Sequence, residues 1–154
     1  MATTVSRRTI EASHALVIRK TIAPSEIAAT LAESLPRVFA YAQHAGVAFA
    51  GPPFMRYLHT GIGLMTIEAG MPIATTTRAA DGIEAIELPA GPVAVATHRG
   101  AYDKLPETHA AVQRWIAAQG HATGGAPWEV YVTDPGEKPN PADWVTEVFY
   151  PLDR

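Results

Sequence analysis

The sequence lacks cysteine altogether, and this absence excludes several classes of site. Without a thiol, the chain of 154 residues forms no disulfide, iron–sulfur cluster, thiolate metal site or cysteine nucleophile. A chain of this length buries about 70% of its unfolded surface on folding. We therefore expect one domain, residues 1–154, that needs neither a disulfide nor a metal ion to fold.

Excess charge and long apolar runs are also missing. Twelve Lys and Arg stand against fifteen Asp and Glu, which gives a net charge of −3 without a basic run. A nucleic-acid partner is not expected, because such proteins carry a basic surface. No apolar run approaches the roughly 20 residues of a membrane-spanning helix, and no apolar signal core follows the N-terminus. We expect a cytoplasmic protein that does not bind membranes.

Metal and cofactor motifs are absent too. The six histidines are scattered, and none lies four residues from another or near a carboxylate in a metal-binding pattern. We expect no metal and no cofactor. The oligomeric state stays open, a homodimer included.

What the sequence does contain is a regular series of strand and helix patterns. A helix is expected from Pro24-Ser25-Glu26 to Gly46, with a kink or break at Pro36, and another from about Asp103 to Gly120. Residues 5–10 and 15–21 are predicted to form a hairpin. Further strands are expected at 55–60, 64–73, 83–88, 93–98, 128–133 and 145–152.

Two halves of the sequence resemble each other. The run from Gly51 to Tyr57 aligns with Gly125 to Tyr131, and Glu68-Ala-Gly-Met-Pro72 aligns with Glu147-Val-Phe-Tyr-Pro151. Each half follows the order strand, strand, helix, strand, strand. The interpretation is an α+β fold of duplicated ββαββ units, with repeats at about 5–73 and 81–152. Antiparallel sheets would carry helices on one face and a ligand cleft between the halves.

Strand alternation selects candidate ligand-binding residues. Side chains alternate between faces along a strand, so Glu129 and Tyr131 share one face and Glu147 and Phe149 share one face. We expect the aliphatic faces to pack under the helices and these polar faces to line the cleft. The first half supplies Tyr57 and Glu68 at matching positions. Carboxylates beside aromatic rings suit a planar or cationic molecule, although a solvated sheet face would explain each glutamate singly.

The second half carries motifs typical of one family. His98-Arg-Gly-Ala-Tyr102, Trp128-Glu-Val-Tyr-Val-Thr-Asp-Pro135 and Trp144-Val-Thr-Glu-Val-Phe-Tyr-Pro-Leu152 resemble the GyrI-like small-molecule-binding domain, the effector-binding module of AraC- and MerR-type multidrug regulators. The resemblance covers about residues 5–152. It implies a duplicated fold of the SHS2 type, with a ligand cleft between its halves.

The resemblance also implies what the candidate residues do. Aromatic residues and a glutamate of the family's cleft bind lipophilic cations, and these correspond to Tyr131 and Glu147. Because no helix-turn-helix pattern precedes residue 5, we expect a stand-alone binding protein rather than a transcription factor.

Two alternatives stay open. Some stand-alone relatives resemble hydrolases of strained cyclopropanoid compounds, for which Glu147 would be the catalytic residue, with Tyr131 or Glu129 assisting. The family name comes from a DNA gyrase inhibitor, so inhibition of gyrase by protein–protein contact is the other alternative.

Overall fold

The computed structural model describes residues 3–60, 63–78, 80, 82–133 and 137–153. Its elements follow the order strand, strand, helix, strand, strand twice over. The helices are α1 (Ile27–Ala45) and α2 (Leu105–Ala118), and short 3-10 turns span Pro24–Glu26, Tyr102–Lys104 and Pro141–Asp143. The strands are β1 (Val5–Ile10), β2 (Ser13–Ile22), β3 (Phe54–Thr60), β4 (Met65–Ile73), β5 (Glu84–Leu88), β6 (Gly91–Arg99), β7 (Trp128–Tyr131) and β8 (Val145–Pro151).

The chain divides into two compact units that do not coincide with the two halves of the sequence. Unit 2 is the continuous segment 12–89, whereas unit 1 combines residues 1–11 with residues 90–154. The predicted hairpin between β1 and β2 is therefore wrong, because β1 pairs with β6 and β2 pairs with β4 and β5. The two residues between β1 and β2, Glu11 and Ala12, also lack the glycine or asparagine that a two-residue hairpin turn favours.

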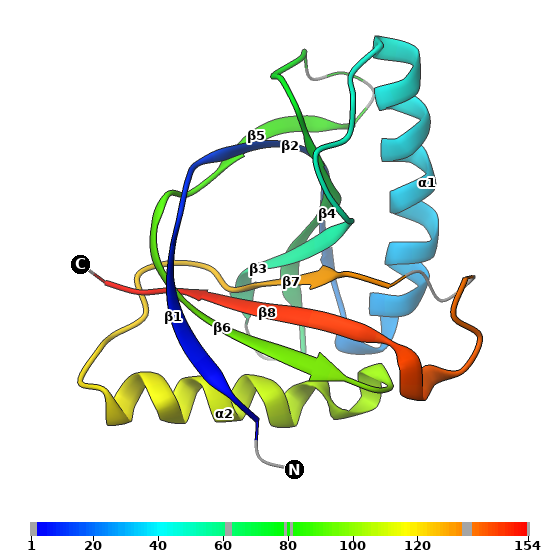
Figure 1. Ribbon diagram of the computed structural model, residues 1–154. Coiled ribbons are helices and arrows are strands. Elements are labelled where there is room, and N and C mark those ends of the chain that lie inside the picture. The colour runs from blue at the N-terminus through cyan, green and yellow to red at the C-terminus, as the bar shows by residue number, and fades with distance from the viewer. Residues whose placement is uncertain (1–2, 61–62, 79, 81, 134–136, 154) are drawn as a thin grey trace. The chain divides into compact units, whose positions relative to one another are not determined.

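Each unit is an antiparallel sheet with one helix on one face (Figure 1). In unit 1 the strand order is β1-β6-β8-β7, and in unit 2 it is β3-β4-β2-β5. The core under α2 is formed mainly by Val112, Ile116, Val148 and Tyr150. The core under α1 is formed by the buried residues Leu16, Ile18, Val38, Ala42, Ile73 and Ile83.

The last two strands of each unit pair in the same register. Phe54 lies opposite Gly70 in unit 2, and Trp128 lies opposite Phe149 in unit 1. The differences, 128 − 54 = 74 and 149 − 70 = 79, are the offsets of the sequence alignment. The aligned glutamates Glu68 and Glu147 therefore occupy equivalent places in their sheets.

The first helix continues through its proline. We expected a kink or break at Pro36, but α1 is one helix from Ile27 to Ala45, so the expected break is wrong. An interior proline removes one helical hydrogen bond and costs about 3 kcal/mol. Val38 and Ala42, two and six residues later, are fully buried in the core of unit 2, and this burial offsets the cost. Among the described residues, neither helix is both long and apolar enough to cross a membrane.

A buried ion pair network crosses the sheet of unit 2. The Glu68 side chain is fully buried, and its two carboxylate oxygens bind Arg56 at 2.7 Å and Arg19 at 2.9 Å. These arginines lie opposite Glu68 on β3 and β2. The Arg19 pKa is raised, first by its hydrogen bond to Glu68. Because a buried charge without partners is very costly, the two guanidinium groups are what allow a carboxylate here.

Replacing Glu68 by glutamine tests this network. The amide removes the negative charge that both guanidinium groups contact, so Glu68→Gln should lower the free energy of unfolding by about 2–3 kcal/mol, less than for a fully buried network because Arg19 is half exposed. Urea unfolding of wild type and variant measures the change. Glu87→Gln, an exposed position on β5, serves as the matched control. A change within 0.5 kcal/mol, about the size of an ordinary surface substitution, would contradict this reading.

Gly70 is required by close packing of backbones. A Cβ atom at this position would overlap the backbone carbonyl of Leu16 on the neighbouring strand β2. Backbone of a paired strand cannot move aside without breaking its hydrogen bonds.

We therefore expect Gly70→Ala to destabilise the protein by more than about 2 kcal/mol. Gly46→Ala at the end of α1 is a useful comparison, because its added methyl group would meet open space and only its positive φ of 71° would be strained. Thermal unfolding of both variants separates steric overlap from conformational strain. A loss in Gly70→Ala below about 0.5 kcal/mol would contradict the steric requirement.

Candidate functional site

The strand register divides the candidate residues of unit 1 between two faces of the sheet. Glu129 lies opposite Val148, and Tyr131 lies opposite Thr146, so both point to the face that α2 covers. Glu147 lies opposite Val130, and Phe149 lies opposite Trp128, on the other face.

This division corrects the expected placement of Glu129 and Tyr131. We expected both to share the face of Glu147, away from the helices, with Val130 packed beneath α2. The register gives the reverse, and α2 supplies a polar partner, His109, for the buried carboxylate. Tyr57 of unit 2 repeats the arrangement, because it lies opposite Ile67, on the face of α1, whereas Glu68 lies on the other face.

A hydrogen-bonded chain surrounds Glu129. Only 3% of Glu129 is exposed. Its Oε2 atom lies 2.6 Å from Nε2 of His109, and its Oε1 atom accepts a hydrogen bond from the Tyr131 hydroxyl at 2.9 Å. Nδ1 of His109 lies 2.7 Å from the Tyr150 hydroxyl. Strands β7 and β8 and helix α2 thus bring Tyr131, Glu129, His109 and Tyr150 into one chain.

The donors and acceptors of this chain match when the histidine is neutral. An ionised carboxylate only accepts, so His109 donates from Nε2–H to Glu129. Nδ1 then accepts from the Tyr150 hydroxyl, and the Tyr131 hydroxyl donates to the other carboxylate oxygen. In this assignment the carboxylate of Glu129 carries the one charge among the four groups.

The charge of Glu129 affects its neighbour. The pKa of Tyr150 is raised to about 12, mainly because burial disfavours the phenolate and also because Glu129 repels it. Tyr150 therefore stays a neutral hydroxyl throughout the physiological range, as the hydrogen-bond assignment requires.

Aromatic rings extend the cluster from Tyr131 towards the surface. The ring centroid of Tyr102 lies 5.6 Å from that of Tyr131 and 4.8 Å from that of Trp144. Tyr102 and Trp144 are partly exposed, whereas Tyr131 is buried. Trp144 is held in place by a hydrogen bond from its indole nitrogen to the backbone carbonyl of Lys138. We call Glu129, His109, Tyr150, Tyr131, Tyr102 and Trp144 the acidic aromatic cluster.

The second carboxylate, Glu147, has a different environment. Its nearest cation is Arg8 on β1 at 3.8 Å, and the two side chains are 27% and 52% exposed. Water screens such a pair, so it contributes little to stability. Beside it, Trp128 and Phe149 stack with ring planes within 4° and centroids 5.2 Å apart. The face opposite α2 therefore also combines a carboxylate with aromatic rings.

Unit 2 has no equivalent of the Glu129 carboxylate. Glu129 lies two residues before Tyr131. The corresponding residue in unit 2, two before Tyr57, is Met55, which is fully buried. Glu68, the equivalent of Glu147, is held by Arg19 and Arg56. The roles of Tyr57 and Glu68 in ligand binding stay predictions.

Sequence reasoning missed His109, Tyr150, Tyr102 and Trp144. One signal pointed to the histidine: position 109 falls on the stripe of Leu105, Val112 and Ile116, where a polar residue needs a buried partner. The partner could not be named without the register of β7. In the part of the chain that the structure describes, no three His, Asp or Glu side chains gather as metal ligands.

The Tyr150 phenol provides a spectroscopic test of the cluster. Its pKa of about 12 in the folded state exceeds the unfolded value of 10, so the folded form binds its proton more tightly. This contribution to stability is fully present below pH 10 and is lost as the pH rises from 10 to 12, by about 1.4 kcal/mol per pH unit. The difference in phenolate absorbance between wild type and Tyr150→Phe should titrate near pH 12. A midpoint near pH 10 would contradict the burial of Tyr150 beside Glu129.

Comparison with known proteins places this geometry in context. The chain matches the GyrI-like small molecule binding domain over residues 3–153. No curated protein matches the sequence. Among solved structures, the EcmrR C-terminal domain is similar, with a TM-score of 0.89, 19% identity, and coverage of 100% of this chain and 99% of that one.

Two further structures share the fold at lower identity. SAV2435, solved with bound tetraphenylphosphonium, has a TM-score of 0.68 and 15% identity over 99% of this chain and 94% of its own. A hydrolase encoded by lin2189 from Listeria innocua has a TM-score of 0.66 and 12% identity, over 99% of this chain and 93% of its own. These likenesses bear out the α+β class. The chain belongs to the GyrI-like small-molecule-binding domain family.

Proposed function

We propose that this protein binds lipophilic molecules that are cationic or planar, and that Glu129 supplies the negative charge for a bound cation. The family supports small-molecule binding in general. The finer proposal is carried by one observation: a desolvated carboxylate accepts a hydrogen bond from Tyr131, whose ring packs against that of Tyr102.

Physical chemistry favours Glu129 over Glu147 as the counter-charge. Glu129 is buried, so its field acts through a medium of low dielectric, whereas water and Arg8 screen Glu147. A cation about 5 Å from a charge at an effective dielectric of 20 gains about 3 kcal/mol. The rings of Tyr102 and Trp144 add stacking area and cation–π attraction.

A relative of the same fold supports the choice of probe. SAV2435 was solved with tetraphenylphosphonium, a delocalised cation with an apolar surface. Triphenylphosphine oxide has a similar body and no net charge. The pair therefore separates the contribution of charge from that of apolar burial.

We expect Glu129→Gln to weaken tetraphenylphosphonium binding by between about tenfold and a hundredfold, since the variant loses the charge at a desolvated site. Binding of triphenylphosphine oxide should change less than about threefold. Isothermal titration calorimetry of both ligands measures this, and a melting curve confirms that the variant is folded.

Glu147→Gln is the matched variant, because it removes the same charge from the other face of β7 and β8. The family resemblance implies that Glu147 binds the cation, and this alternative predicts a large loss there instead. Loss of cation binding in Glu147→Gln alone would show that Glu147, and not Glu129, supplies the charge for the bound cation. Equal losses for the charged and neutral ligands in both variants would contradict an electrostatic role of either glutamate.

Hydrolysis with His109 as the general base is less well supported by the geometry. Both ring nitrogens of His109 are engaged, one by Glu129 and one by Tyr150. A general base needs a nitrogen or oxygen within hydrogen-bonding reach of the attacking water, so His109 would first have to give up a partner. The network is better suited to holding a charge in place than to moving a proton onto or off a substrate.

A further inference from the structure

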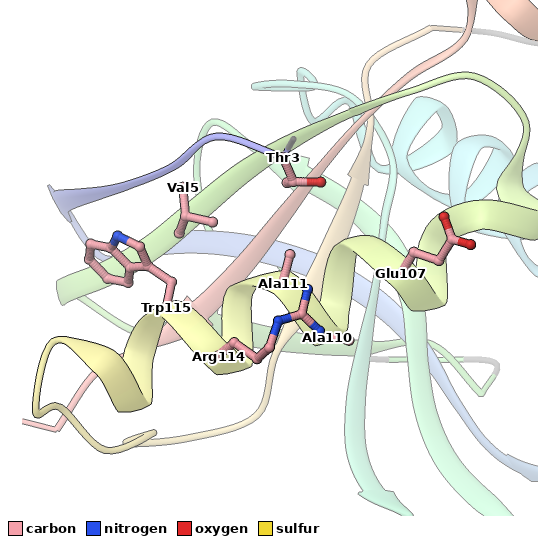
Figure 2. Close-up of a pocket in the computed structure, with 7 residues that line it drawn as sticks. All are labelled: Thr3, Val5, Glu107, Ala110, Ala111, Arg114 and Trp115. Carbon is pink, nitrogen blue, oxygen red and sulfur yellow. The ribbon is translucent and has the colours of Figure 1, made fainter. Parts of the chain in front are cut away.

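A groove on unit 1 lies apart from the acidic aromatic cluster. It has a volume of about 610 Å³ and is lined by Thr3, Val5, Glu107, Ala110, Ala111, Arg114 and Trp115. Figure 2 shows it between the start of β1 and one side of α2, with Trp115 beside Val5 at one end and Glu107 at the other. A volume of this size is in the range of small-molecule sites.

The floor of the groove is flat because its middle consists of small residues. Ala110 and Ala111 lie one turn from Glu107 on one side and one turn from Arg114 and Trp115 on the other. From Glu107 to Trp115 the helix rises about 12 Å, which is long enough for a fused two-ring or three-ring system. Bulky side chains at both ends and methyl groups between them leave a slot for a planar body.

Two donors at this groove lack partners in the protein. Arg114 is exposed and forms no ion pair or hydrogen bond with any residue that the structure describes. Trp115 packs partly against the core, and its indole N–H likewise donates to none of the described residues. In Figure 2 the Arg114 side chain extends from α2 near Ala110 and Ala111, and the indole nitrogen of Trp115 is on the edge of the ring towards Val5.

The charges define which ligand fits. Arg114 presents a fixed positive charge with planar donors that suit a carboxylate, sulfonate or phosphate oxygen. Glu107 lies two turns away and has Lys104 at 3.9 Å, so it does not neutralise Arg114. We propose that the groove between β1 and α2 binds an organic anion with a flat aromatic body, Arg114 holding the anionic group and Trp115 contacting the rings. The acidic aromatic cluster would select the opposite charge.

Two naphthalene dyes test the proposal directly. 1-Anilinonaphthalene-8-sulfonate carries a sulfonate, and N-phenyl-1-naphthylamine has nearly the same rings without a charge. Their fluorescence reports binding to the folded protein. We expect Arg114→Gln to weaken binding of the sulfonate at least tenfold and binding of the neutral dye by less than threefold, because only the charged contact is lost.

Filling the floor tests the position of the site. Ala110→Leu places a bulky side chain where the rings would lie, so it should weaken both dyes by at least tenfold. Ala117→Leu, on the exposed side of the same helix, is the matched control and should leave both unchanged. Arg99→Gln, which removes an exposed arginine elsewhere in unit 1, is the matched control for charge.

The outcomes are distinguishable from those of the proposed function. Tetraphenylphosphonium binding should be unchanged in Arg114→Gln and Ala110→Leu, whatever Glu129→Gln does. The proposal is overturned if the sulfonate dye does not saturate, if Arg114→Gln weakens both dyes equally, or if Ala110→Leu binds them as well as wild type.

Discussion

Burial of a carboxylate is the constraint around which each unit is organised. A carboxylate removed from water must receive hydrogen bonds or a counter-charge, and the two units satisfy this requirement differently. Unit 2 surrounds Glu68 with two guanidinium groups from neighbouring strands, which more than offset its charge. Unit 1 surrounds Glu129 with a tyrosine hydroxyl and an imidazole, which satisfy its oxygens without requiring a second buried charge. The first arrangement is suited to stability, and the second keeps a negative field that a ligand can use.

The repeat makes this difference visible within one chain. Val130 lies opposite Glu147 on the paired strand, whereas Arg56 lies opposite Glu68 at the equivalent position. The two equivalent glutamates therefore have different neighbours. In the same way, Met55 takes the place of Glu129. At each of these two positions, one unit carries an apolar residue where the other carries a charged one. The two units therefore share one framework, and a few residue differences give them different chemistry.

Much of the fold could be predicted from the sequence, because hydrophobic periodicity, glycines and prolines are local signals. The order of strands and helices, the offset between repeats and the end of α1 at Gly46 follow from such signals. What could not be predicted depends on pairing. The partner of β1 lies far away in the sequence, and the face of Glu129 depends on which residue of β8 lies opposite it. A change of register by one residue exchanges the two faces of a strand, so the sequence could nominate Glu129 as a candidate but could not say on which face it lies.

The exchange of first strands between the repeats has a consequence for the way the chain folds. All strands of unit 2 come from one continuous stretch, so its contacts close short or moderate loops. Unit 1 needs β1 from one end of the chain to pair with β6 from beyond unit 2, which closes a loop that contains all of unit 2. Pairing of this long range is slow, because its entropy must be lost before the contacts form. During synthesis the whole of unit 2 leaves the ribosome before β6 does, so β1 stays unpaired over that time. The two arginines of β1 keep the unpaired strand polar.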